Sequence, residues 1–429
     1  MKNNVKNLIE FIDHSPSCFH VIENARKQFL EYGFMELKEK EYWDLEEGKS
    51  YFVTRNGSSI IAFHLPKKDF QGFHIVASHS DSPTYRIKEQ PEMSVEKHYT
   101  KLNIERYGGM IPETWFDRPL SVAGRIIIEE NGQIKDQLVN IDRDLMIIPN
   151  LAIHMSRSSN ESKQLNPQKD LLPLCGGNLT KDGFEEMIAK ESGVEKEDIL
   201  SYDLFLYNRM RGTTLGINEE FVAAPKLDDL ECVYSSIEGM LNAKLSKDYV
   251  TVCAVFDNEE VGSGTKQGAG STFFPEVLKR ISYLCGKNEE EYYMAVADSF
   301  MLSADNAHAV HPNYQDKTDP TNRPYINEGI VLKYNASQKY TTDANSAALV
   351  KYLCKKEKIK CQVFFNRSDM LGGSTLGNIL TGQVSIKAAD IGLPQLSMHS
   401  TYETAGCKDL DDMITLMGSF YELGKEVQI

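Results

Sequence analysis

Apolar, strand-like runs alternate with helix-like segments over most of this chain of 429 residues. The stretch "GFHIVASHSDSP" (72–83) is an apolar strand that runs into a polar turn, and Val252–Phe256 is a second buried strand. Further elements are expected as helices after Asp228, Gly270 and Thr342 and over 409–427, and as strands over 292–300, 327–335 and 360–366. This alternation predicts an α/β fold with a mainly parallel sheet flanked by helices.

A different pattern interrupts this rhythm between residues 86 and 222. Short alternating stretches such as "GRIIIEENGQI" (124–134), with Asn131-Gly132 as a turn signal, indicate β-hairpins, and one charged helical piece covers 180–200. We therefore predict an α/β domain formed by residues 1–85 and 223–429, with a β-rich domain inserted over 86–222.

Composition excludes several classes of partner. The net charge is −15 and no long cluster of Lys or Arg occurs, so nucleic acid is not expected. No stretch approaches the roughly 20 apolar residues that span a bilayer, and the first residues lack the apolar run of a signal peptide. The eight scattered cysteines form no CxxC pair, which favours the reducing cytoplasm.

The N-terminal part is expected to be helical. In "SPSCFHVIENARKQFLEYGF" (15–34), Ser15 is a plausible N-cap, Pro16 occupies the first helical position and Gly33 lies near the stop.

Polar side chains collect where the predicted strands end. Glu259 and Glu260 follow the strand at 252–256, and Gly262 and Gly264 then allow a sharp turn. The other strand-end clusters are "SHSDSP" with His79 and Asp81, "APKLDDL" with Asp228, "LSADNAHAVHPNY" with Asp305, His308 and His311, and "LSMHSTYE" with His399. Each cluster alone is better explained by a solvated turn, a helix cap or an ordinary histidine. A sheet brings strand ends together, so jointly they indicate a site.

Imidazole and carboxylate ligands without cysteine suit Zn²⁺, Mn²⁺ or Co²⁺. These clusters contain one more carboxylate than a single zinc ion needs, which suggests two ions that share a bridging Asp. Two metal ions about 3.5–4 Å apart can activate a water and polarise a carbonyl group. Hydrolysis also needs a base that is not a ligand, and an adjacent Glu pair can provide both a ligand and a base. Asp81, two residues after His79, can accept a hydrogen bond from the imidazole and fix its tautomer.

These motifs, with "FDNEEVGS", "ETWFDRPLSVAGR", "IPNLAIHMSR" and "GGSTLGNI", closely resemble the aspartyl aminopeptidase family of metallopeptidases over essentially the whole chain. The resemblance implies a catalytic α/β domain interrupted by a β-rich dimerisation domain, assembled into tetrahedral dodecamers. It implies that His79 and Asp305 bind one metal, that Glu260 and His399 bind the other, that Asp228 bridges them, and that Glu259 is the general base.

The same resemblance implies further roles outside the metal ligands. His154 would reach a neighbouring subunit's active site and stabilise the oxyanion, and Lys333 would face an acidic substrate side chain. Gly373, in the "GGSTLGNI" motif, would contribute to substrate binding. For His308 and His311 we expect supporting or packing roles in preference to a third metal cluster.

We therefore predict an aminopeptidase that removes N-terminal residues, preferably Asp or Glu, from peptides with two zinc ions, or alternatively cobalt or manganese. One alternative is a carboxypeptidase or an N-acyl amino acid deacylase with the same metals. Another is a non-catalytic assembly protein on a peptidase fold. The loss of a metal ligand or of Glu259 would favour that alternative, but the sequence contains all of them. The glycine-rich "GSGTKQGAGS" (262–271) matches neither GxGxxG nor GxxxxGK(S/T), the two spacings typical of nucleotide-binding loops, and it follows acidic residues. It is therefore not expected to bind a nucleotide.

Overall fold

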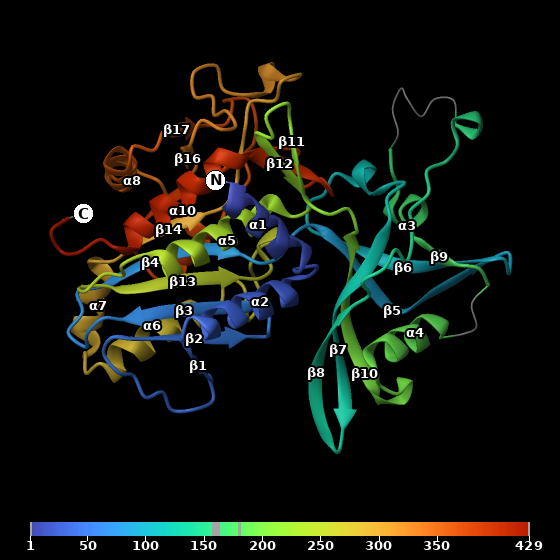
Figure 1. Ribbon diagram of the computed structural model, residues 1–429, viewed down its shortest axis with the longest axis horizontal. Helices are drawn as coiled ribbons and strands as arrows, with labels where there is room; N and C mark the ends of the chain where they lie inside the picture. Colours follow the sequence, from blue (N-terminus) through green and yellow to red (C-terminus); the bar gives the residue numbers. More distant parts are fainter. Residues whose placement is uncertain (1, 157–163, 179–181, 428–429) are drawn as a thin grey trace.

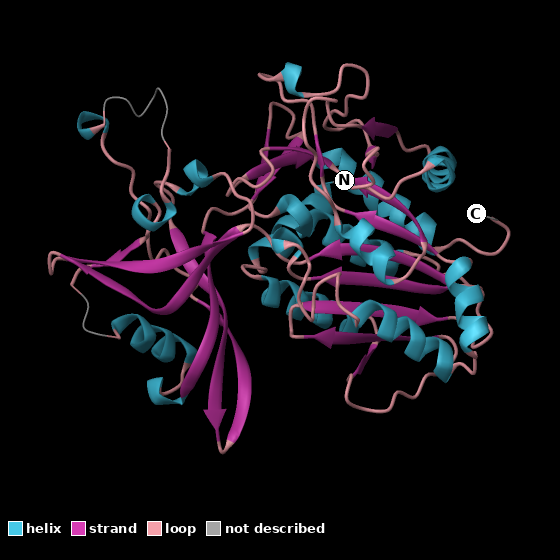
Figure 2. Ribbon diagram, turned by 180° about the vertical axis from the view of Figure 1, so that it is seen from behind, coloured by secondary structure: helices cyan, strands magenta, loops and turns pink. Residues whose placement is uncertain are grey.

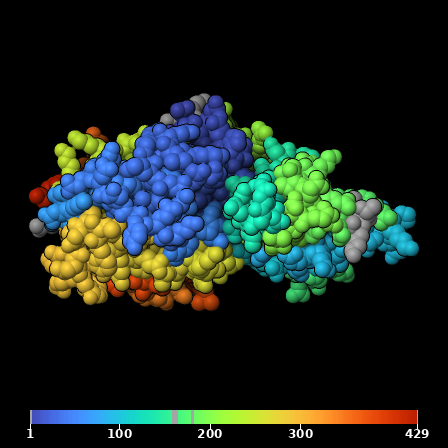
Figure 3. Space-filling model, turned by 90° about the horizontal axis from the view of Figure 1, so that it is seen from below, coloured from blue at the N-terminus to red at the C-terminus, as the bar shows by residue number. Residues whose placement is uncertain are grey.

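The computed structural model describes residues 2–156, 164–178 and 182–427. A large sheet with helices on both faces lies beside a second, helix-poor sheet (Figures 1 and 2). Seen as a surface, these two parts form neighbouring lobes (Figure 3). Among the described residues, no helix is long and apolar enough to cross a membrane.

The large sheet confirms the predicted α/β class. Its central strands β13, β4, β14 and β18 are parallel neighbours, whereas β2–β3, β3–β13 and β16–β18 pair antiparallel. Its nine strands, in spatial order, are β1 (Met35–Leu37), β2 (Lys49–Arg55), β3 (Ser59–Leu65), β13 (Val250–Phe256), β4 (Phe73–His79), β14 (Phe300–Ala304), β18 (Lys387–Gly392), β16 (Ile330–Lys333) and β17 (Cys361–Phe364).

Helices cover both faces of this sheet because its central strands are apolar on both sides. In β13, Cys253 and Val255 join one apolar core, while Val252 and Ala254 join the other, as the two-residue period of a strand requires. The first core packs α1 (Lys2–Asp13), α2 (Cys18–Glu31), α5 (Leu227–Asn242), α8 (Ala344–Glu357) and α10 (Cys407–Tyr421). The second packs α6 (Phe273–Leu284), α7 (Glu289–Ala297) and α9 (Leu376–Gln383).

The second lobe is an antiparallel sheet with its own apolar core. Asn131 and Gly132 both have positive φ, 53° and 74°, which suits the predicted hairpin turn between β7 and β8. The strands, in spatial order, are β8 (Gln133–Asn140), β7 (Leu120–Glu130), β10 (Ile199–Asn208), β5 (Thr84–Val95), β6 (Tyr99–Tyr107) and β9 (Leu174–Gly176), accompanied by α3 (Pro167–Asp170) and α4 (Gly183–Ser192).

A third, five-stranded sheet joins the segment after the second lobe to the C-terminal part of the chain. Its strands are β11 (Thr213–Leu215), β12 (Phe221–Ala224), β20 (Glu403–Gly406), β19 (Pro394–Leu396) and β15 (Ala307–His308). The domain boundaries at 85/86 and 222/223 stay predictions.

Two sequence predictions about local structure are wrong. The stretch 292–300 is not a strand, because α7 occupies Glu289–Ala297 and β14 begins only at Phe300. A reciprocal capping box between Asn288 and Glu291 starts this helix and outweighs the β-propensity of the residues that follow. The N-cap of α2 is Ser17, not Ser15, so Pro16 precedes the helix instead of opening it.

Candidate metal centre

The carboxyl ends of three parallel strands bring predicted site residues together. His79 is the last residue of β4 and pairs in register with Phe256 of β13. Glu259 and Glu260 lie in the short 3-10 helix η4 (Glu259–Val261) after β13, and Asp305 directly follows β14. Because these strands are parallel neighbours, their ends open onto the same edge of the sheet.

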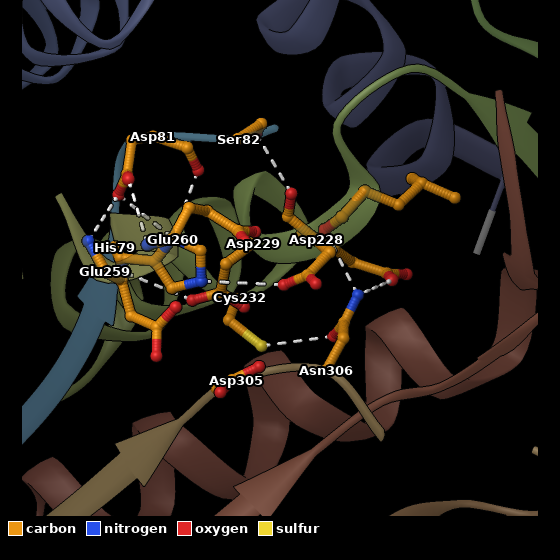
Figure 4. Close-up of polar contacts among 12 residues, drawn as sticks. His79, Asp81, Ser82, Asp228, Asp229, Cys232, Glu259, Glu260, Asp305 and Asn306 are labelled. Atoms are coloured by element: carbon orange, nitrogen blue, oxygen red, sulfur yellow. Dashed lines mark hydrogen bonds and ion pairs between the residues drawn. The ribbon is translucent and has the colours of Figure 1, made fainter. Parts of the chain in front are cut away.

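The remaining predicted ligands come from other parts of the fold. Asp228 lies in the first turn of α5, and His399 lies in the loop between β19 and β20. Three sets of side chains each place one ligand atom per residue within 4.8 Å of one another: His79, Asp228, Asp229 and Asp305; His79, Glu259 and Glu260; and Asp228, Glu260 and His399. The close-up shows the side chains of His79, Asp228, Asp229, Glu259, Glu260 and Asp305 gathered in one region (Figure 4).

Asp228 occupies the centre of this arrangement. Its Oδ1 lies 3.5 Å from His79 Nε2, and its Oδ2 lies 3.3 Å from His399 Nε2. His399 Nε2 is also 3.3 Å from Glu260 Oε1. The two oxygens of one carboxylate therefore face different histidines, an arrangement that allows one carboxylate to contact two neighbouring ligand groups.

The buried oxygens of this cluster test whether a cation suits it. Asp228 Oδ1, Asp229 Oδ1 and Glu260 Oε1 are buried and have no hydrogen-bond partner within the described parts of the chain. An unpaired buried carboxylate oxygen is costly, and a bound cation removes that cost. With two imidazoles and no thiolate, the donor set suits zinc, cobalt or manganese.

Both histidines present the same nitrogen to the cluster. His79 Nδ1 lies 3.1 Å from the backbone carbonyl of Asp81, and His399 Nδ1 hydrogen-bonds the backbone carbonyl of Gly109. A carbonyl can only accept, so Nδ1 is the protonated nitrogen of each ring. This leaves Nε2 of each ring, which faces Asp228, with a lone pair for a metal.

The crowding of carboxylates governs the electrostatics. Burial raises the pKa of Glu259 to about 8, and burial with the nearby Asp228 charge raises the pKa of Glu260 well above its ordinary value. Burial works against protonation of His399, but its contact with Asp228 raises the pKa of that imidazole to about 8. The site thus concentrates negative charge that favours cations.

Asp81 contacts the imidazole of His79, as predicted, and also holds the neighbouring turn. Its backbone oxygen is the nearer acceptor for His79, while its carboxylate Oδ1 lies 3.3 Å from the same nitrogen. Asp81 Oδ1 and Oδ2 accept hydrogen bonds from the backbone N–H groups of Glu259 and Glu260, at 3.1 and 3.2 Å. One carboxylate thus holds the turn that carries the Glu pair.

Lys333 lies beside the predicted ligand Asp305. Its Nζ donates to the backbone oxygens of Asp305 and Asn306, at 2.7 and 3.2 Å, and lies 3.6 Å from Asp305 Oδ2. It also lies 5.2 Å from the centre of the Tyr340 ring. Burial opposes its charge, but Asp305 raises the pKa of this buried lysine above its ordinary value, so the cation persists.

The remaining predicted residues lie outside the three ligand sets. His154 is exposed in the 3-10 helix η2 (Ile153–Met155), and Arg157, the last residue of its motif, falls outside the described residues. Gly373 lies in the exposed loop before α9. His311 packs against Tyr314, and His308 packs against Phe364, with ring centres 4.9 and 6.0 Å apart.

Sequence reasoning missed three residues that shape this site. Asp229 belongs to one ligand set and accepts a hydrogen bond from the backbone N–H of His79 at 3.1 Å. The buried carboxylate of Glu403 accepts from the backbone N–H groups of Asp228 and His399, at 3.0 and 2.6 Å. Tyr107, from the second lobe, hydrogen-bonds Asp81. The quoted motifs contain the first two, whereas no sequence signal indicates Tyr107.

Comparisons with known proteins identify the family of this chain. A family model described as "Aminopeptidase I zinc metalloprotease (M18)" matches residues 11–421. A relative from Clostridium novyi (strain NT), named "Probable M18 family aminopeptidase 2", is 46% identical over 437 residues, covering 99% of this chain and 100% of the relative.

Solved structures agree as well. The structure described as "Cryo-EM structure of the Ape4 and Nbr1 complex" is similar with a TM-score of 0.95 at 37% identity, covering 98% of this chain and 85% of that one. The "Structure of S. cerevesiae mApe1 dodecamer" is similar with a TM-score of 0.86 at 27% identity, covering 98% and 97%. The chain described here therefore belongs to the M18 family of zinc metallo-aminopeptidases.

Proposed function

We propose that this M18 aminopeptidase removes single N-terminal residues, preferentially Asp and Glu, with a dinuclear metal centre and Glu259 as general base. The observation that carries the proposal is the position of Asp228. Its two carboxylate oxygens face His79 and His399 separately, and Glu259 lies within the same cluster.

These contacts support the ligand assignment that the family resemblance implies. His79 and Asp305 would hold one cation, Glu260 and His399 the other, and Asp228 both. Zinc agrees with the family description, while cobalt and manganese accept the same donor atoms. When bound, the two cations would polarise the scissile carbonyl group and acidify a water molecule.

Glu259 would move the proton in this reaction. Burial raises the pKa of the Glu259 carboxyl, and cations beside it would lower that pKa again and keep the carboxylate ionised at neutral pH, ready to accept a proton. Asp81 holds the Glu259 backbone, so the base keeps its position while it takes a proton from water and passes it to the leaving amine. Lys333 is the cation proposed to favour acidic substrates, with Gly373 as a further substrate contact.

Assembly forms the second part of the proposal. A similar solved structure is described as a dodecamer, and we propose a homo-oligomer for this chain too, as a tetrahedral dodecamer built from dimers. His154 would then complete the site of a neighbouring subunit. A cytoplasmic location is proposed because all eight cysteines, each within the described part of the chain, are free thiols.

The experiment is a panel of dipeptides with free or blocked termini, assayed before and after metal removal. We expect hydrolysis of Asp- and Glu-initiated peptides with a free amine, loss of activity with a chelator, and recovery on adding Zn²⁺. Hydrolysis confined to N-acylated peptides would contradict the proposal and indicate a deacylase. Hydrolysis that requires a free C-terminal carboxylate would indicate a carboxypeptidase.

A further inference from the structure

A segment of the second lobe contacts the metal centre of its own chain. This segment, Tyr107–Thr114, begins at the end of β6 and enters the 3-10 helix η1 (Pro112–Trp115). It lies between the Glu259–Glu260 turn and the loop that carries His399, and it contacts both. We call it the clamp segment.

The first contact fixes the turn that carries the Glu pair. Tyr107 Oη donates to Asp81 Oδ2 at 2.7 Å and accepts from Asn258 Nδ2 at 2.8 Å. The same Asp81 carboxylate holds the backbone N–H groups of Glu259 and Glu260. One phenol hydroxyl of the second lobe thus joins a strand end of the large sheet to the residue that precedes the Glu pair.

The next residue permits a close approach to a proposed ligand. Gly108 has a φ of +79°, and a Cβ at this position would lie 3.1 Å from Glu260 Cβ. Both the backbone conformation and the contact therefore favour glycine here.

The second contact fixes the other histidine. The Gly109 carbonyl accepts from His399 Nδ1, and the Ile111 N–H donates to the His399 carbonyl at 3.0 Å. Thr114 extends the contact through Thr401, whose N–H donates to Thr114 Oγ1 at 3.1 Å and whose hydroxyl donates to the Thr114 carbonyl at 2.7 Å. His399 has a φ of +67°, a conformation that a non-glycine residue keeps only when its surroundings hold it.

From these contacts we propose that the clamp segment is a positioning element of the metal centre in cis. The partner of His79 Nδ1 is Asp81, which Tyr107 holds, and the partner of His399 Nδ1 is Gly109 itself. Such partners orient imidazole ligands and set metal affinity. The position of the second lobe against the large sheet therefore controls the affinity of the centre for its cations. This role rests on the proposed ligand assignment and is separate from that of His154 in a neighbouring subunit.

The test compares two tyrosines of the second lobe in the full-length chain. Tyr107→Phe removes the hydrogen bond to Asp81, while Tyr202→Phe removes a hydrogen bond to the Lys88 carbonyl that lies wholly within the lobe. Zn²⁺ affinity is measured by competition with a chelator, without substrate. We expect Tyr107→Phe to weaken Zn²⁺ binding roughly 10- to 100-fold, and Tyr202→Phe to match wild type. Equal Zn²⁺ affinities in both variants would overturn the proposal.

A pair of glycines provides a second, backbone-level test. Gly108→Ala and Gly132→Ala both place a side chain at positive φ, +79° and +74°, but a Cβ at Gly132 meets nothing within 4 Å. Only Gly108→Ala should weaken Zn²⁺ binding. If both variants keep wild-type affinity, the clamp segment has no positioning role.

The substrate panel separates this result from the proposed function. Tight Zn²⁺ binding by wild type that depends on Tyr107, without peptide hydrolysis, would support the clamp and contradict the peptidase. Peptide hydrolysis with a Zn²⁺ affinity that is independent of Tyr107 would support the peptidase and contradict the role of the clamp segment.

Discussion

Glu259 and Glu260 are neighbours in the chain but lie in different surroundings. The chain leaves β13 at Phe256 and turns through Asn258, whose φ is +62°, so the pair no longer follows the alternation of a strand. Asp81 binds both backbone N–H groups, which fixes the two Cα positions. Glu260 Oε1 then lies 3.3 Å from His399 Nε2. Glu259 lies close to His79 and Glu260 and is the residue proposed as the base for a substrate water.

This difference leads to a prediction for the two Gln variants. Glu259→Gln keeps the shape of the side chain but cannot take a proton, so turnover should fall by roughly 10²- to 10⁴-fold. Its bound metal, measured by elemental analysis, should match wild type. Glu260→Gln should instead lose metal. Near-normal turnover by fully metallated Glu259→Gln would exclude Glu259 as the base.

Lys333 leads to a second prediction at this scale. An ammonium group in a partly dehydrated pocket stabilises a substrate carboxylate more than it would in water. Lys333→Met should therefore lower kcat/KM for Asp and Glu peptides by about 10²-fold, from the loss of a charged hydrogen bond of ~1.5–3 kcal/mol. Leucyl peptides, assayed in parallel, should change little. An equal loss on both substrate classes would mean that Lys333 acts by holding the Asp305–Asn306 segment, whose two backbone carbonyls accept hydrogen bonds from its Nζ.

At the scale of elements, β4 packs a histidine into an apolar core. His74 is 1% exposed, its ring stacks on Tyr249 at 4.0 Å between ring centres, and Phe420 of α10 lies 5.2 Å away. Its Nδ1 is buried without a hydrogen-bond partner in the described chain. Burial lowers the pKa of this imidazole from 6.5 to about 3, so the folded protein keeps it neutral.

The packing of His74 predicts a pH-dependent stability. Below about pH 6.5 the unfolded chain binds a proton at His74 that the folded chain does not, so stability falls as the pH decreases, until about pH 3. At pH 5 this loss amounts to about 2 kcal/mol relative to pH 7.5. His74→Phe should reduce the difference in unfolding free energy between pH 7.5 and 5 by that amount, measured with chelator present.

A matched control variant is His98→Phe, at an exposed position of the second lobe. It should retain the full wild-type difference. If His74→Phe retains it as well, His74 does not titrate as its burial implies.

At the scale of the whole molecule, the second lobe exposes apolar side chains around His154. Leu151, Ile153 and Met155 are 54%, 46% and 77% exposed. Clustered exposed apolar residues are typical of interaction surfaces. The surface that carries His154 is therefore suited to contact another copy of the chain, as the proposed assembly requires.

This arrangement predicts complementation between inactive subunits. The His154→Ala subunit lacks the imidazole that would enter the active site of a neighbouring subunit. The Glu259→Gln subunit lacks the general base of its own site. Mixed oligomers should form some sites with Glu259 from one subunit and His154 from another, and so recover part of the activity. If verified mixed oligomers stay as inactive as the single variants, His154 does not act on a neighbouring subunit.

The sequence by itself determined much of the fold and the chemistry of the site. Apolar periodicity is a local property, so the alternation of strands and helices in the large sheet could be predicted. The stretch 292–300 was misjudged because the deciding signal, the capping box at Asn288, lies outside it. The gathering of histidine and carboxylate side chains was also predictable, because polar residues after apolar strands meet at one sheet edge; their roles as metal ligands stay predictions.

Only the tertiary structure decided how these groups meet. That Asp228 turns one oxygen to His79 and the other to His399 depends on three elements packed together. Glu403 binds the backbone of Asp228, which lies 175 positions away in the chain. Tyr107 of the second lobe binds Asp81, which lies 26 positions away. Such pairings leave no periodic pattern in the sequence, because they arise from how whole sheets and lobes pack and not from the preferences of neighbouring residues.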